Sequence, residues 1–417
     1  MKFENINLIE PILKAIKAKG YTSPTPIQEQ AIPAILEGRD LLGCAQTGTG
    51  KTAAFANPTL QILHKAREAG DWSKDIKALI ITPTRELAIQ IDESFGEYGK
   101  GLNMRHAVIF GGVKQHWQVK TLEKGVDILV ATPGRLLDLM NQGYVRLNNL
   151  QIFTLDEADR MLDMGFIHDV KKVIAQLPAR RQTLFFSATM PPVIAKLANT
   201  LLQKPIKVEV APVSSTAETI EQRLFYVDKG NKKHLLMYVL SDDVMDSVLV
   251  FTRTKHGANK LATFLQKAGV SAAAIHGNKS QSARQKALKD FKDGNVRVLV
   301  ATDIAARGID INELSFVVNY DVPNEPESYV HRIGRTGRAK NSGIAFSLCE
   351  RDEQKYVRDI QRLIKKDIPV AEGHPFPFST TNRPPAAEKS SRPAPRGRAK
   401  NPSHKHSKPW NKGGKKY

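Results

Sequence analysis

The segment AQTGTGKT (residues 45–52) combines the residue types that bind a polyphosphate. It follows the apolar run DLLGC and precedes the helical segment AAFANPTLQIL. Backbone N–H groups from Thr47 to Thr52, at the start of a helix, are suited to surround phosphate oxygens. Lys51 is expected to reach the β- and γ-phosphates, and Thr52 to ligate Mg²⁺. Ala45 stands where the general motif has glycine, but the GKT core favours a phosphate site over an ordinary glycine-rich turn.

A second segment, QIFTLDEADRML (151–162), places three carboxylates directly after an apolar run. Buried carboxylates repel one another and resist desolvation, so a cation must compensate them. Beside a phosphate loop, Asp156 is the candidate ligand for Mg²⁺, and Glu157 the candidate base that orients and deprotonates an attacking water. Asp159 is expected to face a different neighbour. The alternative is a solvated helix start, where acids favour the helix dipole.

Apolar runs that alternate with helical segments predict the elements that hold these residues. Continuous runs of this kind suit parallel strands buried on both faces, and strand–helix alternation predicts a doubly wound α/β sheet. Because the pattern occurs twice, we expect two such domains, with polar residues gathered at the carboxyl ends of the strands. The predicted strands are DLLGCA, ALIITP, AVIFGG, DILVATP, IFTLDEAD and TLFFSAT, then RLFYV, SVLVFTRT, AAAIHG, VRVLVATD, SFVVNYDVP and GIAFSLC.

The predicted organisation is a first domain over residues 1–208, a linker over 209–218, a second domain over 219–370 and a basic disordered tail over 371–417. The linker is marked by EVAPVSSTAE, rich in Pro, Ser, Thr and Ala. The tail has few large apolar residues, which is typical of disorder.

The charge of the chain indicates an acidic partner. The 417 residues carry a net charge of +20, and residues 381–417 hold 11 Lys and Arg against one acid. Such an excess favours nucleic acid as the partner, with a generally basic protein as the alternative. The two cysteines predict no disulfide or zinc site. The start has no signal-peptide pattern and no apolar run reaches a membrane span, so we expect a cytoplasmic protein.

With these residues assembled, the chain resembles the DEAD-box ATP-dependent RNA helicases, whose name-giving tetrad matches residues 156–159. The family's fold implies two tandem RecA-like domains. Upstream, GYTSPTPIQ (20–28) resembles the adenine-reading motif, and an amide side chain suits adenine because it both donates and accepts. The nucleotide-binding residues implied by the resemblance are Phe3, Tyr21, Gln28, Ala45, Gln46, Thr47, Gly48, Thr49, Gly50, Lys51, Thr52, Asp303, Gly308 and Asp310.

The same resemblance implies an RNA interface that both domains supply. Its first-domain segments match PTRELA (83–88), the glycine pair at 111–112 and TPGR (132–135), and its second-domain segments match VFTRT (250–254), HGN (276–278) and the start of ATDIAARGID (301–310). The implied RNA-binding residues are Pro83, Thr84, Arg85, Gly111, Gly112, Thr132, Pro133, Gly134, Arg135, Arg253, Thr254, Gly277, Gln281, Arg284 and Thr302.

Two further segments carry implied roles in catalysis and coupling. SAT (187–189) resembles the segment that couples hydrolysis to strand separation, with Asp159 as partner of Ser187, Ala188 and Thr189. HRIGRTGR (331–338) implies Arg335 and Arg338 as arginine fingers, with His331 and Arg332 as links between the domains. Its alternative is a basic loop on a solvated face; the glycine spacing and the need for planar charge near the γ-phosphate favour the functional interpretation.

The resemblance therefore implies an ATP-dependent RNA helicase that uses ATP and Mg²⁺. Its RNA-stimulated hydrolysis would drive local, non-processive unwinding of short duplexes, or remodelling of RNA–protein complexes, with little sequence preference. The short basic tail is similar to the bacterial RhlE-type branch, which implies a role in ribosome assembly or RNA decay, with the corresponding protein partners. We expect a monomer with no membrane association. Two alternatives remain: a DNA helicase or translocase of the same superfamily, and an RNA-annealing scaffold with a vestigial ATP site.

Overall fold

A computed structural model describes residues 2–46, 48–70, 73–210, 220–242, 245–306, 314–336 and 343–378. One compact unit ends at Phe378. Several predictions concern residues outside the described ones: Thr47, Gly308, Asp310, Arg338, most of the linker and the tail from residue 379. Among the helices of the described part, none is both long and apolar enough to cross a membrane.

The first sheet has seven parallel strands in the order β3-β4-β2-β5-β6-β1-β7. Three neighbouring strands, β4, β2 and β5, are buried along their whole length, as their continuous apolar runs predict. The strands are β1 (Leu41–Cys44), β2 (Ala78–Ile81), β3 (His106–Ile109), β4 (Ile128–Ala131), β5 (Ile152–Leu155), β6 (Gln182–Ser187) and β7 (Ile206–Glu209).

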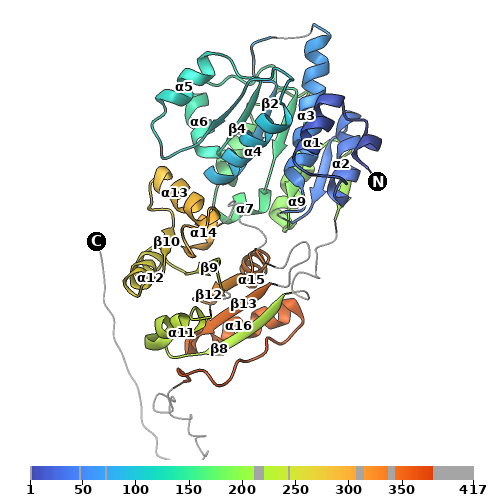
Figure 1. Cartoon of the computed structure of the whole chain (residues 1–417). Coiled ribbons are helices and arrows are strands. Elements are labelled where there is room, and N and C mark those ends of the chain that lie inside the picture. Colours follow the sequence, from blue (N-terminus) through green and yellow to red (C-terminus); the bar gives the residue numbers. More distant parts are fainter. Residues whose placement is uncertain are drawn as a thin grey trace, which may run out of the picture. The chain divides into compact units, whose positions relative to one another are not determined.

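Helices cover both faces of this sheet, because successive strand residues point to opposite sides. On β1, for example, Leu41 packs in one hydrophobic cluster and Leu42 in the other. The first face carries η1 (Phe3–Ile6), α1 (Glu10–Ala18), α2 (Pro26–Leu36), α3 (Lys51–Glu68) and α4 (Arg85–Tyr98) (Figure 1). The opposite face carries α5 (His116–Glu123), α6 (Pro133–Asn141), α7 (Ala158–Asp163), α8 (Ile167–Ile174) and α9 (Pro192–Leu201).

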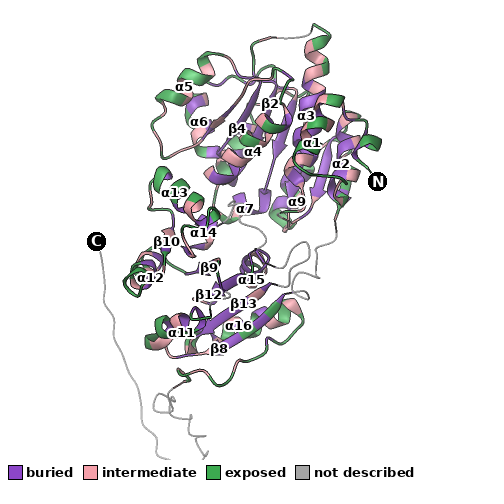
Figure 2. Ribbon diagram, viewed as in Figure 1, coloured by how far each residue is buried: buried purple, intermediate pink, exposed green. Residues whose placement is uncertain are grey.

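The second sheet has six parallel strands in the order β10-β11-β9-β12-β13-β8. They are β8 (Glu221–Tyr226), β9 (Val248–Phe251), β10 (Ala272–Ile275), β11 (Val298–Ala301), β12 (Phe316–Asn319) and β13 (Ile344–Cys349). Its helices are η2 (Lys229–Asn231), α11 (Lys232–Val239), α12 (Lys255–Lys267), α13 (Gln281–Lys292), α14 (Asp303–Ala306), α15 (Pro326–Ile333), η3 (Arg351–Glu353) and α16 (Gln354–Ile364). In both sheets the central strands are buried and the outer helix faces are exposed (Figure 2).

Strand order sorts the motifs into two groups at the carboxyl edge of the first sheet. The neighbouring strands β3, β4 and β2 lead into the Gly111–Gly112, TPGR and PTRELA segments. The neighbouring strands β5, β6 and β1 lead into the DEAD, SAT and phosphate-loop segments. The predicted fold class of two doubly wound parallel sheets is confirmed, and all twelve predicted strand segments contain a strand.

Two features differ from the expected organisation. The segment IKVE forms the edge strand β7, and Val210 N–H still donates to the Cys44 carbonyl, so residues 209 and 210 belong to the sheet and not to the linker. The predicted tail starts at residue 371, but Ala371 N–H donates to the Leu224 carbonyl of β8, and Phe376 packs in the core. Strand pairing and aromatic burial therefore extend the second domain to Phe378.

We expect Gly43→Ala to destabilise the first domain. A Cβ added to Gly43 on β1 would lie 2.6 Å from the Phe186 ring, whereas one on Gly230 meets nothing within 4 Å. Overpacking of this kind costs about 1–3 kcal/mol. Urea unfolding followed by circular dichroism should show a lower midpoint for Gly43→Ala and an unchanged one for the control, Gly230→Ala; equal midpoints would contradict the packing.

Candidate functional site

The phosphate loop between β1 and α3 is stabilised by hydrogen bonds among its own residues. Gly50 is the N-cap of α3 with φ of 94°, in the left-handed region that favours glycine. Lys51 is nearly fully buried, and its Nζ donates to the Ala45 carbonyl at 2.8 Å. The Thr49 hydroxyl donates to the Gln46 carbonyl at 2.7 Å. The loop thus presents backbone N–H groups and one lysine at a helix start, which is the arrangement that binds phosphate.

A cavity of about 370 Å³ opens beside this loop. It includes the predicted residues Tyr21, Gln28, Lys51 and Thr52, whereas Phe3 is buried in the hydrophobic core and does not line it. The lining residues are Lys19, Tyr21, Ser23, Thr25, Gln28, Gly48, Gly50, Lys51, Thr52, Ala53, Leu87, Gln90, Ser94, Tyr98, Asp156, Glu157 and Arg335. The predicted phosphate, adenine and acid segments therefore meet at one place.

Gln28 joins the predicted adenine motif to the phosphate loop. Its Oε1 accepts from Thr25 N–H at 3.1 Å, and its Nε2 donates to the Gly50 carbonyl at 3.1 Å. An amide oxygen has two acceptor sites and an NH₂ group has two donors. Each end of the Gln28 amide therefore keeps one hydrogen-bonding site for an adenine edge.

The acids after β5 are buried, and nearby cations compensate them. Glu157 begins the turn into α7 with φ of 55°, a strained conformation for a residue with a side chain. Its Oε2 accepts from Arg160 Nη1 at 2.9 Å, and the side chains of both are almost fully buried. Burial pushes the pKa of Glu157 upward, but Arg160, Lys51 and Arg335 outweigh this and hold its pKa below the usual value. Glu157 is therefore a carboxylate at neutral pH.

Asp156 lies in the same cavity, but its pKa is shifted in the opposite direction to that of Glu157. Burial raises its pKa to about 7, and Lys51 opposes the shift only in part. A cation is the group that would restore its charged form. Thr52 lines the same cavity, and a hydroxyl with a carboxylate provides the oxygen ligands that Mg²⁺ prefers. The described residues contain no cluster of three or more His, Cys, Asp or Glu side chains that could hold a metal. Thr52 and Asp156 stay the predicted ligands of Mg²⁺, and their oxygen atoms suit that ion.

Asp159 turns away from this pair and contacts the segment after β6. Its Oδ2 accepts from the backbone N–H of Thr189 at 2.8 Å and from the Thr189 hydroxyl at 2.9 Å. The Asp159 N–H donates to the Ser187 hydroxyl, which in turn donates to the Thr189 carbonyl. Burial raises the pKa of Asp159, but the bonds from Thr189 keep it below its usual value. The expected contact with Ser187 and Thr189 is present; Ala188 between them has no described side-chain role.

A second cavity, of about 450 Å³, gathers many of the predicted RNA-binding residues. It is lined by Pro83, Thr84, Arg85, Glu86, Gly111, Thr132, Gly134, Arg135, Asp138, Met164, Phe166, Gly277, Arg284 and Ile304. The predicted residues Gly112, Pro133, Arg253, Thr254, Gln281 and Thr302 do not line it.

Buried polar atoms at or next to this cavity lack partners. Among the described residues, Arg135 Nη1, His276 Nε2, Gln281 Oε1 and Arg284 Nε are buried without a hydrogen bond. Unsatisfied buried groups are rare in folded proteins and call for an explanation, such as a missing ligand. Three of these four atoms are nitrogens of basic side chains, which suits an anionic ligand.

Glu86 is a residue of this site that the sequence analysis did not single out, although it lies within PTRELA. Its carboxylate accepts from Gln281 Nε2 at 3.0 Å and pairs with Arg284 Nη2 at 2.9 Å. The side chains of Glu86 and Arg284 are both almost fully buried. Glu86 therefore holds two of the predicted RNA-binding side chains in place, and its position inside a matched motif was the signal that could have identified it.

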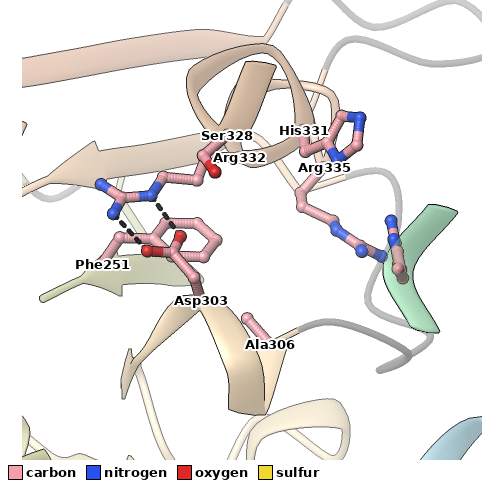
Figure 3. A pocket seen from close by; sticks show the side chains of 8 residues that line it. Phe251, Asp303, Ala306, Ser328, His331, Arg332 and Arg335 are labelled. Carbon is pink, nitrogen blue, oxygen red and sulfur yellow. Dashed lines mark hydrogen bonds and ion pairs between the residues drawn. The ribbon is translucent and has the colours of Figure 1, made fainter. Parts of the chain in front are cut away.

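In the segment predicted to supply arginine fingers, Arg332 and Arg335 have different surroundings. Arg332 donates two hydrogen bonds to the Asp303 carboxylate, from Nε at 2.6 Å and from Nη2 at 2.7 Å. Its Nη1 also donates to the Asn319 side chain and the Asp321 carbonyl. These partners all lie in the second domain, and the link between the domains expected of Arg332 stays a prediction. Figure 3 shows Arg335 extending away from the Arg332–Asp303 pair. Arg335 lines the cavity that holds Lys51 and Glu157.

A buried ion pair supports Arg253 in the second domain. Lys232 Nζ lies 2.7 Å from Glu353 Oε2, and both side chains are almost fully buried. The other oxygen of Glu353 accepts from Arg253 Nη2 at 2.6 Å. Glu353 therefore joins α11, through Lys232, to a predicted RNA-binding arginine.

We expect Glu353→Gln to destabilise the second domain by about 1–3 kcal/mol. It removes the nearest carboxylate of the buried Lys232, whose remaining partners, Asp321 and Glu350, lie farther away at 3.6 and 4.0 Å. Lys232→Met combined with Glu353→Gln should recover part of that loss. Urea unfolding of both single variants and the double variant measures the coupling. The control is Glu221→Gln, which removes an exposed pair with Arg223 and should cost about 0.5 kcal/mol or less. Additive effects of the two buried substitutions would contradict the pairing.

Comparison with known proteins agrees with this assembly of sites. A family model described as DEAD/DEAH box helicase matches residues 25–197, and one described as helicase conserved C-terminal domain matches residues 231–340. An ATP-dependent RNA helicase named CshA from Limosilactobacillus reuteri is 42% identical over 88% of this chain and 72% of its own length. An RNA helicase named CrhR from Synechocystis is 44% identical, over 88% and 74%.

Solved structures give the same result. Dbp5 of S. cerevisiae bound to RNA and ADP BeF3 is similar with a TM-score of 0.76 and 31% identity, over 89% of this chain and 95% of that chain. A DEAD box protein from Methanococcus jannaschii is 40% identical with a TM-score of 0.51, over 89% and 99%. The phosphate loop, the buried acids and the basic cavity thus occur together in a chain that belongs to the DEAD-box family of ATP-dependent RNA helicases.

Proposed function

We propose that RNA stimulates ATP hydrolysis by this chain, and that hydrolysis drives local, non-processive separation of short RNA duplexes or remodelling of RNA–protein complexes. The observation that carries the proposal is the cavity lined by the predicted RNA-binding residues, where the buried Arg135 Nη1 and Arg284 Nε atoms lack partners. An RNA phosphate would supply the missing acceptors. Recognition through phosphates also accounts for low sequence preference.

In the proposed chemistry, the phosphate loop and Lys51 bind the β- and γ-phosphates, and the Gln28 amide holds the adenine edge. Mg²⁺, held by Thr52 and Asp156, would neutralise the charge of the phosphates. Glu157 accepts the proton of the attacking water, because Arg160 and Lys51 keep its carboxylate charged. Arg335 lines the same cavity and stabilises charge that develops on the transferred phosphoryl group.

Coupling between the two cavities is assigned to the bonds between Asp159 and Thr189. Glu157, the proposed base, is two residues from Asp159 on the turn that follows β5. A change at the nucleotide that moves this turn would act directly on the SAT segment after β6. Ser187 and Thr189 are therefore the proposed carriers of the signal toward RNA.

The cellular setting is proposed from the resemblance alone. A basic tail similar to that of the RhlE-type branch favours a cytoplasmic monomer acting on ribosomal precursors or RNA-decay complexes. Residues 379–417 lie outside the described part of the chain, so the tail's role in binding RNA rests on its charge.

The function is tested by ATP hydrolysis with matched RNA and DNA oligonucleotides. We expect RNA to stimulate hydrolysis more strongly than DNA of the same sequence. Equal or stronger stimulation by DNA would favour the DNA translocase alternative, and no stimulation by either would favour the annealing scaffold.

The proposed base is tested by Glu157→Gln, which keeps the size of the side chain but cannot accept the proton. Turnover should fall by about 10²–10⁴-fold while ATP and RNA binding are retained. The matched control is Glu209→Gln, an exposed carboxylate at the end of β7 in the same sheet, which should hydrolyse ATP normally. Turnover by Glu157→Gln at the wild-type rate refutes the assignment.

The proposed coupling is tested by Thr189→Val, which removes the hydroxyl that bonds Asp159 and leaves the backbone N–H bond intact. Losing a hydrogen bond to a charged group should lower the number of duplexes separated per ATP hydrolysed by about tenfold. Thr200→Val, on α9, serves as the control because its hydroxyl bonds only to its own helix. A parallel decrease of hydrolysis and unwinding in Thr189→Val would argue against a coupling role.

A further inference from the structure

Helix α5 is held rigidly beside the Gly111–Gly112 loop although it buries almost nothing. All of its residues are described and none is fully buried; Val119 and Leu122 make half-buried contacts with the core. Its orientation is fixed by Gln118, whose Oε1 accepts from Phe110 N–H at 3.0 Å and whose Nε2 donates to the Phe110 carbonyl at 3.2 Å. Phe110 immediately precedes the glycine pair. Two hydrogen bonds therefore attach the helix to the residue that precedes this loop.

Further bonds strengthen this attachment on the side of the predicted RNA residues. Arg135 Nη2 donates to the Val113 carbonyl at 3.0 Å, between the glycine pair and the helix. Gln115 and Gln142 exchange hydrogen bonds of 2.8 and 3.2 Å, which join the start of α5 to the end of α6. A side chain on the outer face of α5 is thus held at a fixed place relative to the RNA-side cavity.

The outer face of α5 presents one large aromatic ring. Trp117, next to the Gln118 clamp, is 69% exposed, the highest value among the exposed large apolar side chains of the described residues. Lys120 Nζ lies 5.6 Å from the centre of its ring, and the His116 ring meets it edge-on at 5.3 Å. These contacts orient the indole and leave most of it open to solvent.

Charge on this face is mainly positive. Lys114, Lys120 and Lys124 are exposed, with Glu123 as the acid of the segment. Because residues three, four and seven apart share a helix face, Lys120 and Lys124 lie on the same face as Trp117. An exposed aromatic ring flanked by lysines is the combination that stacks a nucleic-acid base and attracts its phosphates.

We propose that Trp117 is a stacking site for a base of the RNA strand where the strand leaves the cavity lined by Gly111 and Arg135. The inference rests on the proposed RNA substrate and extends it, because this helix lies outside the motifs that line the cavity. A single aromatic ring among lysines suits a base better than a protein partner, since protein interfaces require a contiguous apolar patch. Trp117 thus lengthens the RNA footprint on the first domain.

The test uses three single-stranded RNAs and the full chain: a short oligonucleotide, and the same sequence extended at its 5′ end or at its 3′ end. Affinity is measured for the wild type, Trp117→Ala, Trp117→Phe and Tyr238→Ala. Tyr238 is an exposed aromatic residue on α11 of the second domain and serves as the matched control. Trp117→Ala should weaken binding of one extended RNA by at least about fivefold, while Trp117→Phe restores most of the affinity.

A second measurement reports on the indole itself. The chain has three tryptophans, so Trp72→Phe combined with Trp410→Phe leaves Trp117 as the fluorescent residue. Stacking on a base should quench its emission when the extended RNA binds, which a merely structural role would not do. Unchanged affinity of Trp117→Ala for both extended RNAs, or unquenched emission at saturating RNA, overturns the inference.

The two proposals fail in different ways. If RNA does not stimulate ATP hydrolysis by the wild type, the proposed function is wrong and the stacking site falls with it. If RNA stimulates the wild type but Trp117→Ala binds all three RNAs normally, only the stacking site is refuted.

Discussion

The structure depends on compensating three carboxylates that lie almost fully buried after one strand. Asp156, Glu157 and Asp159 follow β5 within four residues, and burial alone would neutralise them. Each obtains a different form of compensation: Glu157 the Arg160 guanidinium, Asp159 the bonds from Thr189, and Asp156 only a partial effect from Lys51. The part of the Asp156 charge that Lys51 does not compensate would favour a metal ion beside this carboxylate.

This compensation requires several strands to end side by side. Lys51 comes from the helix after β1, and Thr189 comes from the segment after β6. In the sheet β6 lies between β5 and β1, so the three strands end side by side. The other half of the sheet, β3-β4-β2, leads into first-domain segments that line the proposed RNA cavity. Parallel strands place all their carboxyl ends at one edge. Strand order therefore separates the candidate nucleotide site from the proposed RNA site while keeping both at one edge of the same sheet.

Most strands and most candidate site residues could be predicted from the sequence. Buried parallel strands have continuous apolar sequences, and the candidate catalytic residues directly follow them. The prediction was weaker where burial is one-sided. The edge strand β7 has the sequence IKVE, in which Lys207 and Glu209 face solvent, so it resembles a loop. Residues 371–378, AEGHPFPF, lack a continuous apolar run, yet His374 and Phe376 pack against aromatic side chains of the second domain. In neither case does the composition of the segment show which strand or which aromatic side chain it contacts.

The sequence by itself determined the fold class, the phosphate loop and the acids beside it, because these depend on local patterns and on short motifs. Only the tertiary structure decided which groups neutralise one another. Glu86 binds Gln281 and Arg284 across a separation of nearly 200 residues, and Arg332 binds Asp303 of its own domain. The exposure of Trp117 was also invisible in the sequence, since an indole on a helix is usually buried. Charge pairing and exposure depend on distances in space, and chain order does not contain those distances.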